Sequence, residues 1–397
     1  MRVHWHIPLI LAVTTFVHYL DRNALALALP QIAAEQGWSD AEIGLYGEYL
    51  LGAFYVSFGL MQIALSGRAE RWNVKGALLL SVAGFCITTM LFYPLGGSIG
   101  GLIGLRLLLG AAESLHMPMN SAIIARSFPD GLRGRANSIY IGGILVALMI
   151  GPLLLVPLME RWGWRGSFAI LGLGGAVISL PLVAWGIPSL PSPKTESSAL
   201  PRLSGPFWLY TAAGAANSFC IFGLLNWLPS YLTRTRGIPF ESVSGPLFGI
   251  FSAGILGLFT WAWIGDWTRQ RLRWAQIGLA GAGLAVLLTA FVEDTPLVLL
   301  CLTAGVFLQS SYNAQEFATL QQLYPPYQAG AITGLYNGLT VLLGGVGGSF
   351  IPGLIVVQTG SFQMGILSIA GGAFLVFSLL SLLHKTLSAS KKDNTFA

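Results

Sequence analysis

Charge is what this sequence has least of, since Asp, Glu, Lys and Arg make up only 9% of its 397 residues. Soluble globular proteins carry about a quarter. A mean hydropathy of +0.69 agrees with a membrane protein and excludes an ordinary soluble domain. Cysteine is also scarce: the three cysteines all fall in apolar segments without metal-ligand spacing, so neither a disulfide framework nor a metal site is expected.

Other absences narrow the function. The apolar run that begins at Ile7 continues too far for a cleavable signal peptide. The pI of 9.2 does not indicate nucleic-acid binding, because the positive charge is scattered over short loops. No nucleophile–base spacing, metal cluster or phosphate loop is present, which argues against a membrane-embedded enzyme and against a cofactor.

What the sequence does contain is twelve apolar segments of membrane-spanning length. Their approximate spans are 7–33, 41–65, 75–95, 99–125, 136–159, 166–187, 206–232, 243–265, 274–292, 296–322, 330–357 and 362–384. The connecting loops are short except for 188–205, where four prolines lie among Ser, Lys and Glu. We therefore predict an all-α membrane protein of two six-helix bundles, 1–187 and 206–397, joined by a cytoplasmic linker at 188–205.

The orientation follows from the loop cations. With a cytoplasmic N-terminus, fifteen Lys and Arg residues face the cytoplasm and four face outward. The four outward residues are Arg161, Arg165, Arg234 and Arg236. The positive-inside rule then predicts that both termini are cytoplasmic.

The two halves resemble a repeat. A gapless offset of 196 places Tyr140 on Tyr336 and Gly142 on Gly338. Parallel repeats of this kind build one large transporter class, whose substrate site lies between the halves. The same offset sets Asp21 opposite Asn217 and Glu113 opposite Gln309, so carboxylates become amides in the second half. If protons are handled here, the first half is expected to handle them.

The stretch 101–136 organises the chain. It begins as an apolar helix, yet it carries Arg106 and Glu113, which lie on one helical stripe about 10 Å apart, with Asn120 continuing the stripe. A charge at bilayer depth costs at least about 2.5 kcal/mol. A binding site or a water-filled cavity therefore accounts for the pair, and the alternative is an Arg–Glu pair that only locks two helices together.

His18, Asp21 and Arg22 occur in the middle of the first apolar segment. Asp21 and Arg22 point about 100° apart on a helix, so one arrangement pairs Asp21 with Arg106 and Arg22 with Glu113, and the reverse is equally open. A carboxyl group between apolar surroundings and an arginine is suited to proton coupling. His18 and His116 are proton-relay candidates, and a polar contact between helices is the alternative for each.

The tenth segment is unusually polar, with Gln309, Asn313 and Glu316. Such side chains suit a hydroxylated ligand, or equally they act as polar contacts between helices. Further candidates for ligand binding, each weak alone, are His18, Tyr49, Asn120, Tyr140, Asn226, Tyr336 and Asn337.

Two loops at equivalent positions combine acids with bases. Rocking of two halves needs latches that break and re-form, so these residues are gating candidates. They are Glu70, Arg71 and Lys75 in the first half and Asp266 and Arg269 in the second. The alternative is that these cations only set the topology.

Several motifs resemble a known family. They are YLDRNALALALP at 19–30, RLLLGAAESLHMPMN at 106–120, FPDGLRGRA at 128–136, WGWRGSF at 162–168, NWLPSYLTRTRGIPF at 226–240 and TGLYNGL at 333–339. With the twelve segments they resemble the major facilitator superfamily and, within it, the anion:cation symporter family. The resemblance covers nearly the whole chain. It implies transport of sugar acids or other organic anions, usually with protons.

By the same resemblance, Asp21 and Glu113 would couple protons, and Arg22 and Arg106 would recognise the anion or gate its passage. The sequence departs from the family pattern at Glu70, Asn73 and Val74, and no Lys or Arg occurs at 207–233. Spinster-like lipid transporters share the Asp-Arg and Arg-x6-Glu elements, so export of an amphipathic lipid or drug is the alternative function.

The expectation is thus a monomeric secondary transporter of the bacterial inner membrane that imports a small organic anion with protons.

Overall fold

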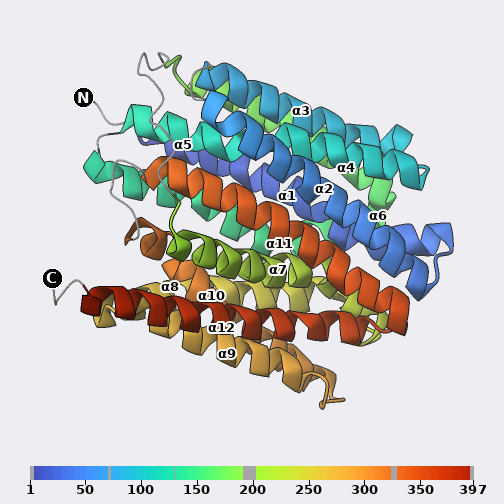
Figure 1. Ribbon diagram of the computed structural model, residues 1–397. Helices are drawn as coiled ribbons and strands as arrows, with labels where there is room; N and C mark the ends of the chain where they lie inside the picture. Colours follow the sequence, from blue (N-terminus) through green and yellow to red (C-terminus); the bar gives the residue numbers. More distant parts are fainter. Residues whose placement is uncertain (1–3, 70–72, 129, 191–202, 323–328, 394–397) are drawn as a thin grey trace. The chain divides into compact units, whose positions relative to one another are not determined.

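The computed structural model describes residues 4–69, 73–128, 130–190, 203–322 and 329–393, and every regular element within these ranges is helical (Figure 1). The elements are α1 (His6–Gln36), α2 (Asp40–Ala69), α3 (Val74–Leu95), α4 (Ile99–Glu113), α5 (His116–Ser127), α6 (Asp130–Gly186), α7 (Gly205–Arg234), the 3-10 turn η1 (Phe240–Ser242), α8 (Ser244–Thr268), α9 (Arg271–Leu288), α10 (Thr295–Gln322), α11 (Ala329–Thr359) and α12 (Phe362–Asp393). The all-α fold class expected from the sequence is confirmed.

The apolar segments correspond closely to these helices. Nine helical stretches within the described ranges are long and apolar enough to cross a membrane. One of them, Ile139–Gly186, contains two of the segments expected from the sequence, because α6 changes direction at Gly163, whose φ of 66° and ψ of 167° are not helical. Glycine reaches a positive φ without the steric cost that a Cβ atom brings.

The segment at 99–125 is divided into two helices. α4 ends at Glu113, and α5 begins at His116. Pro118 lies just inside α5 and has no N–H group to donate to the carbonyl four residues before it, which belongs to Ser114. The break therefore falls between Glu113 and His116, which places their side chains on separately oriented helices.

The chain divides into two compact units. The first contains 1–197 and Pro239–Phe248, and the second contains 198–238 and 249–397. In the first unit α1 packs along α6, α3 packs along α6, and α2 packs along α4 (Figure 1). In the second unit α7 packs against α11 and α12, and α9 packs against α10 and α12.

An ion pair closes one end of the first unit. Trp164 Nε1 donates a 2.7 Å hydrogen bond to Glu35 Oε2, and Arg165 donates to the other carboxylate oxygen. A second Arg165 nitrogen donates to the carbonyl oxygen of Gly96, at 3.4 Å. Burial alone would raise the pKa of Glu35, but the hydrogen bonds from Arg165 and Trp164 hold this pKa below its ordinary value of 4.5. The cluster joins the ends of α1 and α3 to the part of α6 that follows its kink at Gly163.

An arginine has a similar part in the second unit. Arg236 Nε donates a 2.7 Å hydrogen bond to Tyr231 Oη, and its terminal nitrogens donate to the Thr289 carbonyl (3.2 Å) and to Gln363 Oε1 (2.9 Å). The guanidinium thereby ties the end of α7 to α9 and α12. Arg165 and Arg236 both belong to motifs quoted above, and in the structure both hold helix ends together.

Candidate functional site

Four charged side chains are buried within the first unit. Asp21 and Glu113 are 0% exposed, Arg106 is 1% exposed and Arg22 is 4% exposed. Asp21 and Arg22 come from α1, and Arg106 and Glu113 come from α4. Burying four ionisable groups in so apolar a protein is costly unless they serve a function or neutralise one another.

The carboxylates are not paired with the arginines as the sequence suggested. Glu113 Oε2 lies 3.1 Å from His18 Nε2, and both side chains are fully buried. Within the described part of the chain, Asp21 forms no ion pair and neither of its oxygens accepts a hydrogen bond. Both arginines still act on Glu113 through their charges. His18 therefore occupies the position beside Glu113 that the sequence assigned to an arginine.

Arg106 is held by its backbone and ring neighbours. Its Nε donates a 3.0 Å hydrogen bond to the carbonyl oxygen of Leu50, and its guanidinium carbon lies 4.7 Å from the centre of the Phe54 ring. Its Nη1 is buried and donates to no acceptor in the described ranges. The Nη1 group of Arg106 is thus a buried hydrogen-bond donor without an acceptor among the described residues.

Arg22 is surrounded by aromatic rings. Its guanidinium carbon lies between 4.9 and 5.3 Å from the centres of four rings, which belong to Tyr19, Phe54, Tyr55 and Phe58. Aromatic faces attract a cation, most strongly where water is excluded. Because Phe54 contacts both Arg22 and Arg106, its ring links the two guanidinium groups.

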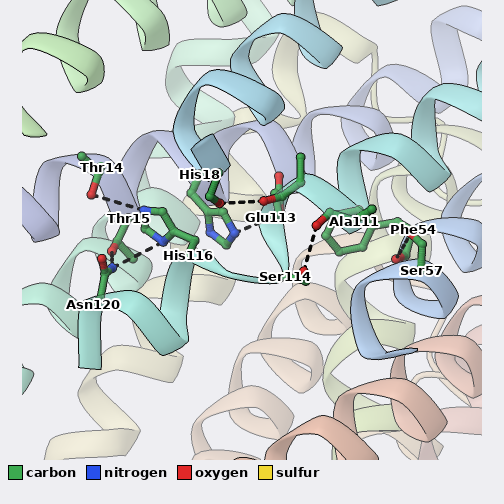
Figure 2. A network of polar contacts seen from close by, with 12 residues as sticks. Thr14, Thr15, His18, Phe54, Ser57, Ala111, Glu113, Ser114, His116 and Asn120 are labelled. Atoms are coloured by element: carbon green, nitrogen blue, oxygen red, sulfur yellow. Dashed lines mark hydrogen bonds and ion pairs between the residues drawn. The ribbon is translucent and has the colours of Figure 1, made fainter. Parts of the chain in front are cut away.

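A polar network continues from His18 on the side away from Glu113. The rings of His18 and His116 are stacked, with centres 4.6 Å apart and planes 10° apart (Figure 2). His116 Nε2 lies 3.3 Å from Thr14 Oγ1, and Asn120 Nδ2 lies 3.4 Å from His116 Nδ1. Asn120 Nδ2 also donates to Thr15 Oγ1, at 3.1 Å. Side chains of α1, α4 and α5 thus form one buried network.

Amides replace carboxylates in the second unit. Gln309 Nε2 donates a 2.7 Å hydrogen bond to Asn217 Oδ1, and Asn217 Nδ2 donates a 2.9 Å hydrogen bond to Asn313 Oδ1. The two candidates from the sequence, Gln309 and Asn313, therefore lie together with Asn217 between α7 and α10. The contacts join helices, whatever else the amides bind.

A second polar cluster in this unit is built on tyrosines. Tyr336 Oη donates a 2.9 Å hydrogen bond to Glu316 Oε1 and lies 2.9 Å from Tyr312 Oη. Tyr210 Oη donates to the Glu316 carbonyl, at 2.9 Å, and its ring stacks on both other tyrosines. The cluster gives Glu316 a hydroxyl partner and connects α7, α10 and α11.

The remaining ligand candidates are spread over the helices. Asn226 Nδ2 donates a 3.0 Å hydrogen bond to Ser349 Oγ, which ties α7 to α11. Tyr140 is 5% exposed and Tyr49 is 42% exposed. Asn337 is half-buried in α11. Tyr49 and Tyr140 belong to the first unit, and Asn226 and Asn337 belong to the second.

Of the gating candidates, Glu70 and Arg71 lie outside the described residues, as does the side chain of Asp266. Lys75 Nζ donates a 2.7 Å hydrogen bond to the carbonyl oxygen of Ala184, which joins α3 to α6. Arg269 is exposed just after α8 and has a φ of 57°.

Sequence reasoning missed the aromatic residues around the arginines. Phe54, Tyr55 and Phe58 lie in α2 among many apolar residues, where aromatic side chains equally often face lipid. The spacing of Phe54 and Phe58 by four residues, which places them on one helix face, was the available signal. Nothing in the sequence indicated which neighbouring helix that face meets.

The arrangement offers two kinds of chemistry in one unit. Two guanidinium groups supply charge and hydrogen-bond donors for an anion, and planar carboxylates suit them well. Two buried carboxyl groups with few partners are suited to binding and releasing protons. No group of three or more His, Cys, Asp or Glu residues in the described ranges is arranged to hold a metal ion.

Comparisons with known proteins agree with this chemistry. The family model of the Major Facilitator Superfamily matches residues 11–349. A D-galactonate transporter of Escherichia coli is 25% identical over 377 residues, which are 86% of this chain and 85% of that protein. A hexuronate transporter of Bacillus subtilis is 25% identical over 91% of this chain and 90% of its own length. A probable sulfoacetate transporter of Cupriavidus necator is 26% identical, with 92% and 90% covered.

Solved structures share the fold. A bacterial homolog of the human lysosomal transporter Spinster, in an inward-facing and occupied conformation, superimposes with a TM-score of 0.84. It is 16% identical, and the match covers 96% of each chain. The unoccupied form gives a TM-score of 0.81. At this identity the likeness concerns the fold alone.

Proposed function

The chain belongs to the Major Facilitator Superfamily, and on that premise we propose that it is a secondary transporter that couples proton entry to uptake of a small organic anion by alternating access. The observation that carries the proposal is the buried Arg106, whose Nη1 has no acceptor in the described ranges and whose guanidinium shares the Phe54 ring with Arg22. An anion that binds between these two buried guanidinium groups neutralises their positive charge and accepts the hydrogen bond that Arg106 Nη1 lacks.

The class of anion follows from donor geometry and from the relatives. A guanidinium binds a carboxylate through two parallel hydrogen bonds. D-Galactonate and hexuronates, which two relatives are named for, are hydroxylated carboxylates. We therefore propose that a sugar acid or a similar carboxylate is the substrate. Gln309 and Asn313 of α10 remain candidates for binding hydroxyl groups, because amides both donate and accept hydrogen bonds.

Protons enter through the carboxyl groups. While Glu113 is ionised, its charge compensates the neighbouring arginines. When Glu113 takes up a proton, that compensation is lost and the guanidinium groups favour an incoming anion. Asp21, whose oxygens accept no hydrogen bond from the described residues, is the second proposed proton carrier. Protons and the anion then cross together.

The cellular setting is proposed on the same grounds. The excess of Lys and Arg in one set of loops supports a bacterial inner-membrane protein with both termini in the cytoplasm. That the transporter acts as a monomer is part of the same proposal.

The test is uptake of labelled D-galactonate and of a hexuronate by protein reconstituted into vesicles with an imposed proton gradient. The wild type should accumulate one of them, and a protonophore should abolish the accumulation. Glu113→Gln should lose accumulation while still exchanging internal for external anion, and Arg106→Ala should lose binding. Arg161→Ala, which removes an exposed arginine of α6, is the matched control for Arg106→Ala and should behave like the wild type.

Unimpaired uphill uptake by Glu113→Gln would end the coupling role, and unchanged affinity in Arg106→Ala would end the anion role. Outward movement of a labelled lipid or dye without any carboxylate transport would favour the exporter that the sequence left open.

A further inference from the structure

We propose that His18 is the group with which Glu113 exchanges its proton, and that His116 positions His18 while staying neutral. The inference rests on the proposed proton coupling and names the next group on the proton's path. Its basis is the 3.1 Å contact between His18 Nε2 and Glu113 Oε2, in which both side chains are fully buried. Among the described residues, the ion pair that Glu113 forms is the one with His18.

The hydrogen bonds of His116 identify its tautomer. Thr14 Oγ1 donates its only proton to the carbonyl oxygen of Leu11, at 3.0 Å. Thr14 Oγ1 must therefore accept from His116 Nε2, which carries the proton. Nδ1 is then the acceptor, and the Asn120 amide donates to it. Both ring nitrogens of His116 are thus satisfied in the neutral form.

A proton added to His116 would disturb this arrangement. The new N–H at Nδ1 would point at the Asn120 Nδ2 amino group, which is itself held by Thr15 Oγ1. Donor would then face donor. His116 is therefore locked as a neutral ring by residues on both sides, and the network in Figure 2 selects His18 as the imidazole that takes up a proton.

The stack explains what the neutral ring contributes. A neutral aromatic face at 4.6 Å and nearly parallel favours a positive charge on the ring that covers it, whereas two charged rings at that distance repel each other. His116 thus supports one positive charge, on His18. The edge of Phe85 lies against both rings and completes the packing.

The transfer itself conserves charge. The proton leaves Glu113 Oε2 and bonds to the lone pair of His18 Nε2, which gives a carboxylate and an imidazolium. Release of the other proton, from Nδ1 to a water molecule, returns a neutral imidazole in the opposite tautomer. His18 Nδ1 is buried and has no hydrogen-bond partner among the described residues, so this release requires a conformation in which water reaches the nitrogen.

Besides His116 on α5, further ionisable groups near His18 belong to α1 itself, to α4, and to the helices α2, α3 and α6 that pack against α1. They are Tyr19, Asp21 and Arg22 on α1, Tyr55 on α2, Cys86 on α3, Arg106 and Glu113 on α4, and Tyr140 on α6. The cation of Arg22 repels a positive charge on His18, and the Glu113 carboxylate, 3.1 Å from Nε2, attracts it. Protonation of His18 is therefore expected to depend on an ionised Glu113.

The experiment compares proton-driven uptake with anion exchange in reconstituted vesicles, using whichever of D-galactonate or a hexuronate the wild type accumulates, over a range of pH. For His18→Gln we expect the ratio of proton-driven uptake to exchange to fall about a hundredfold, the scale of lost acid–base assistance. His384→Gln, which removes an exposed histidine of α12, is the matched control and should leave the ratio and the pH profile unchanged.

His116 is tested through rescue. His116→Ala should lower the same ratio, and His116→Phe should recover most of it, because a phenyl ring stacks without titrating. Histidine nitrogen NMR of the wild type gives a readout that does not depend on variant folding, and the protein has only five histidines to assign. The His116 signals should be those of a neutral ring with its proton on Nε2 at every pH examined.

The outcomes are separable. If the wild type moves no protons with either anion, the proposed function itself fails. If the wild type couples and His18→Gln couples with the same ratio and pH profile, only the role of His18 is overturned. A charged His116 signal, or a loss of coupling in His116→Phe as large as in His116→Ala, overturns the positioning role.

Discussion

Gln309 donates a 2.7 Å hydrogen bond to Asn217, and these amides occupy the positions that follow Glu113 and Asp21 by 196 residues. In the second unit, therefore, the side chains at these two positions form a hydrogen bond with each other. In the first unit the equivalent carboxyl groups of Glu113 and Asp21 do not bond to each other, and Glu113 contacts His18 instead. Amides do not titrate, so Asn217 and Gln309 keep the polar contact between helices but do not carry protons.

The amide pair should accordingly matter for stability rather than for coupling. Asn217→Leu removes the partner of both Gln309 and Asn313, and each lost bond should lower the free energy of unfolding by about 0.5–1.5 kcal/mol. Thermal melting in detergent measures this loss. The number of protons moved per anion, measured in vesicles, should stay at the wild-type value, and a changed ratio would contradict the division of roles between the units.

Much of the architecture could be predicted from the sequence, because spanning length and apolar composition are properties of single segments. The pairing of the buried charges could not. Helical spacing shows that Asp21 and Arg22 point apart, yet it does not show which neighbouring helix each one meets. The break of the helix between Glu113 and His116 also places these two residues on separate helices, whereas the sequence predicts one continuous segment at 99–125.

The shared ring of Phe54 leads to a prediction about anion affinity. Phe54→Leu removes an aromatic face from both Arg22 and Arg106, and a cation–π contact is worth about 0.5–2 kcal/mol. We expect the KM for the anion to rise about twofold to thirtyfold, the range that those energies give. Uptake kinetics in vesicles measure it.

Phe58→Leu is the matched comparison, because among the described residues Phe58 lies against the guanidinium of Arg22 and not against that of Arg106. It should raise the KM less than Phe54→Leu does, and Phe54→Trp should restore most of the affinity. Equal effects of the two leucine variants would show that the sharing of Phe54 has no part in anion binding.

Gly110 should be intolerant of any side chain. A Cβ atom at this position in α4 would collide with the carbonyl oxygen of Phe54 and with Ser57 Oγ in α2. Gly110→Ala must push α4 away from α2 and carry Arg106 with it, so we expect a loss of about 1–3 kcal/mol in stability together with weaker anion binding. Melting temperature and a ligand-induced thermal shift measure the two effects.

Gly104 of the same helix supplies the control, because no atom lies within 4 Å of a Cβ built there. Gly104→Ala should melt at or slightly above the wild-type temperature, since alanine favours a helix over glycine. If both alanine variants melt alike, close contact of α4 with α2 does not hold Arg106 in place.

The lowered pKa of Glu35, near the end of α1, leads to a prediction of how the stability of the first unit depends on pH. Hydrogen bonds from Arg165 and Trp164 hold its folded-state pKa below the ordinary 4.5. A depressed pKa means that the unfolded chain binds the proton more readily, so the ion pair stabilises the fold above pH 4.5 and loses its effect as the pH falls through the folded-state value. Wild type should therefore melt at a higher temperature than Glu35→Gln at pH 7, and the difference should shrink steadily below about pH 4.5.

Because the ion pair of Glu35 and Arg165 is partly exposed, the difference in melting temperature should also be modest and should decrease with added salt. Glu293→Gln, which changes an exposed acid in a loop of the second unit, is the control and should show no such trend. A gap between wild type and Glu35→Gln that stays constant down to pH 3 would show that the helix ends are held by packing alone.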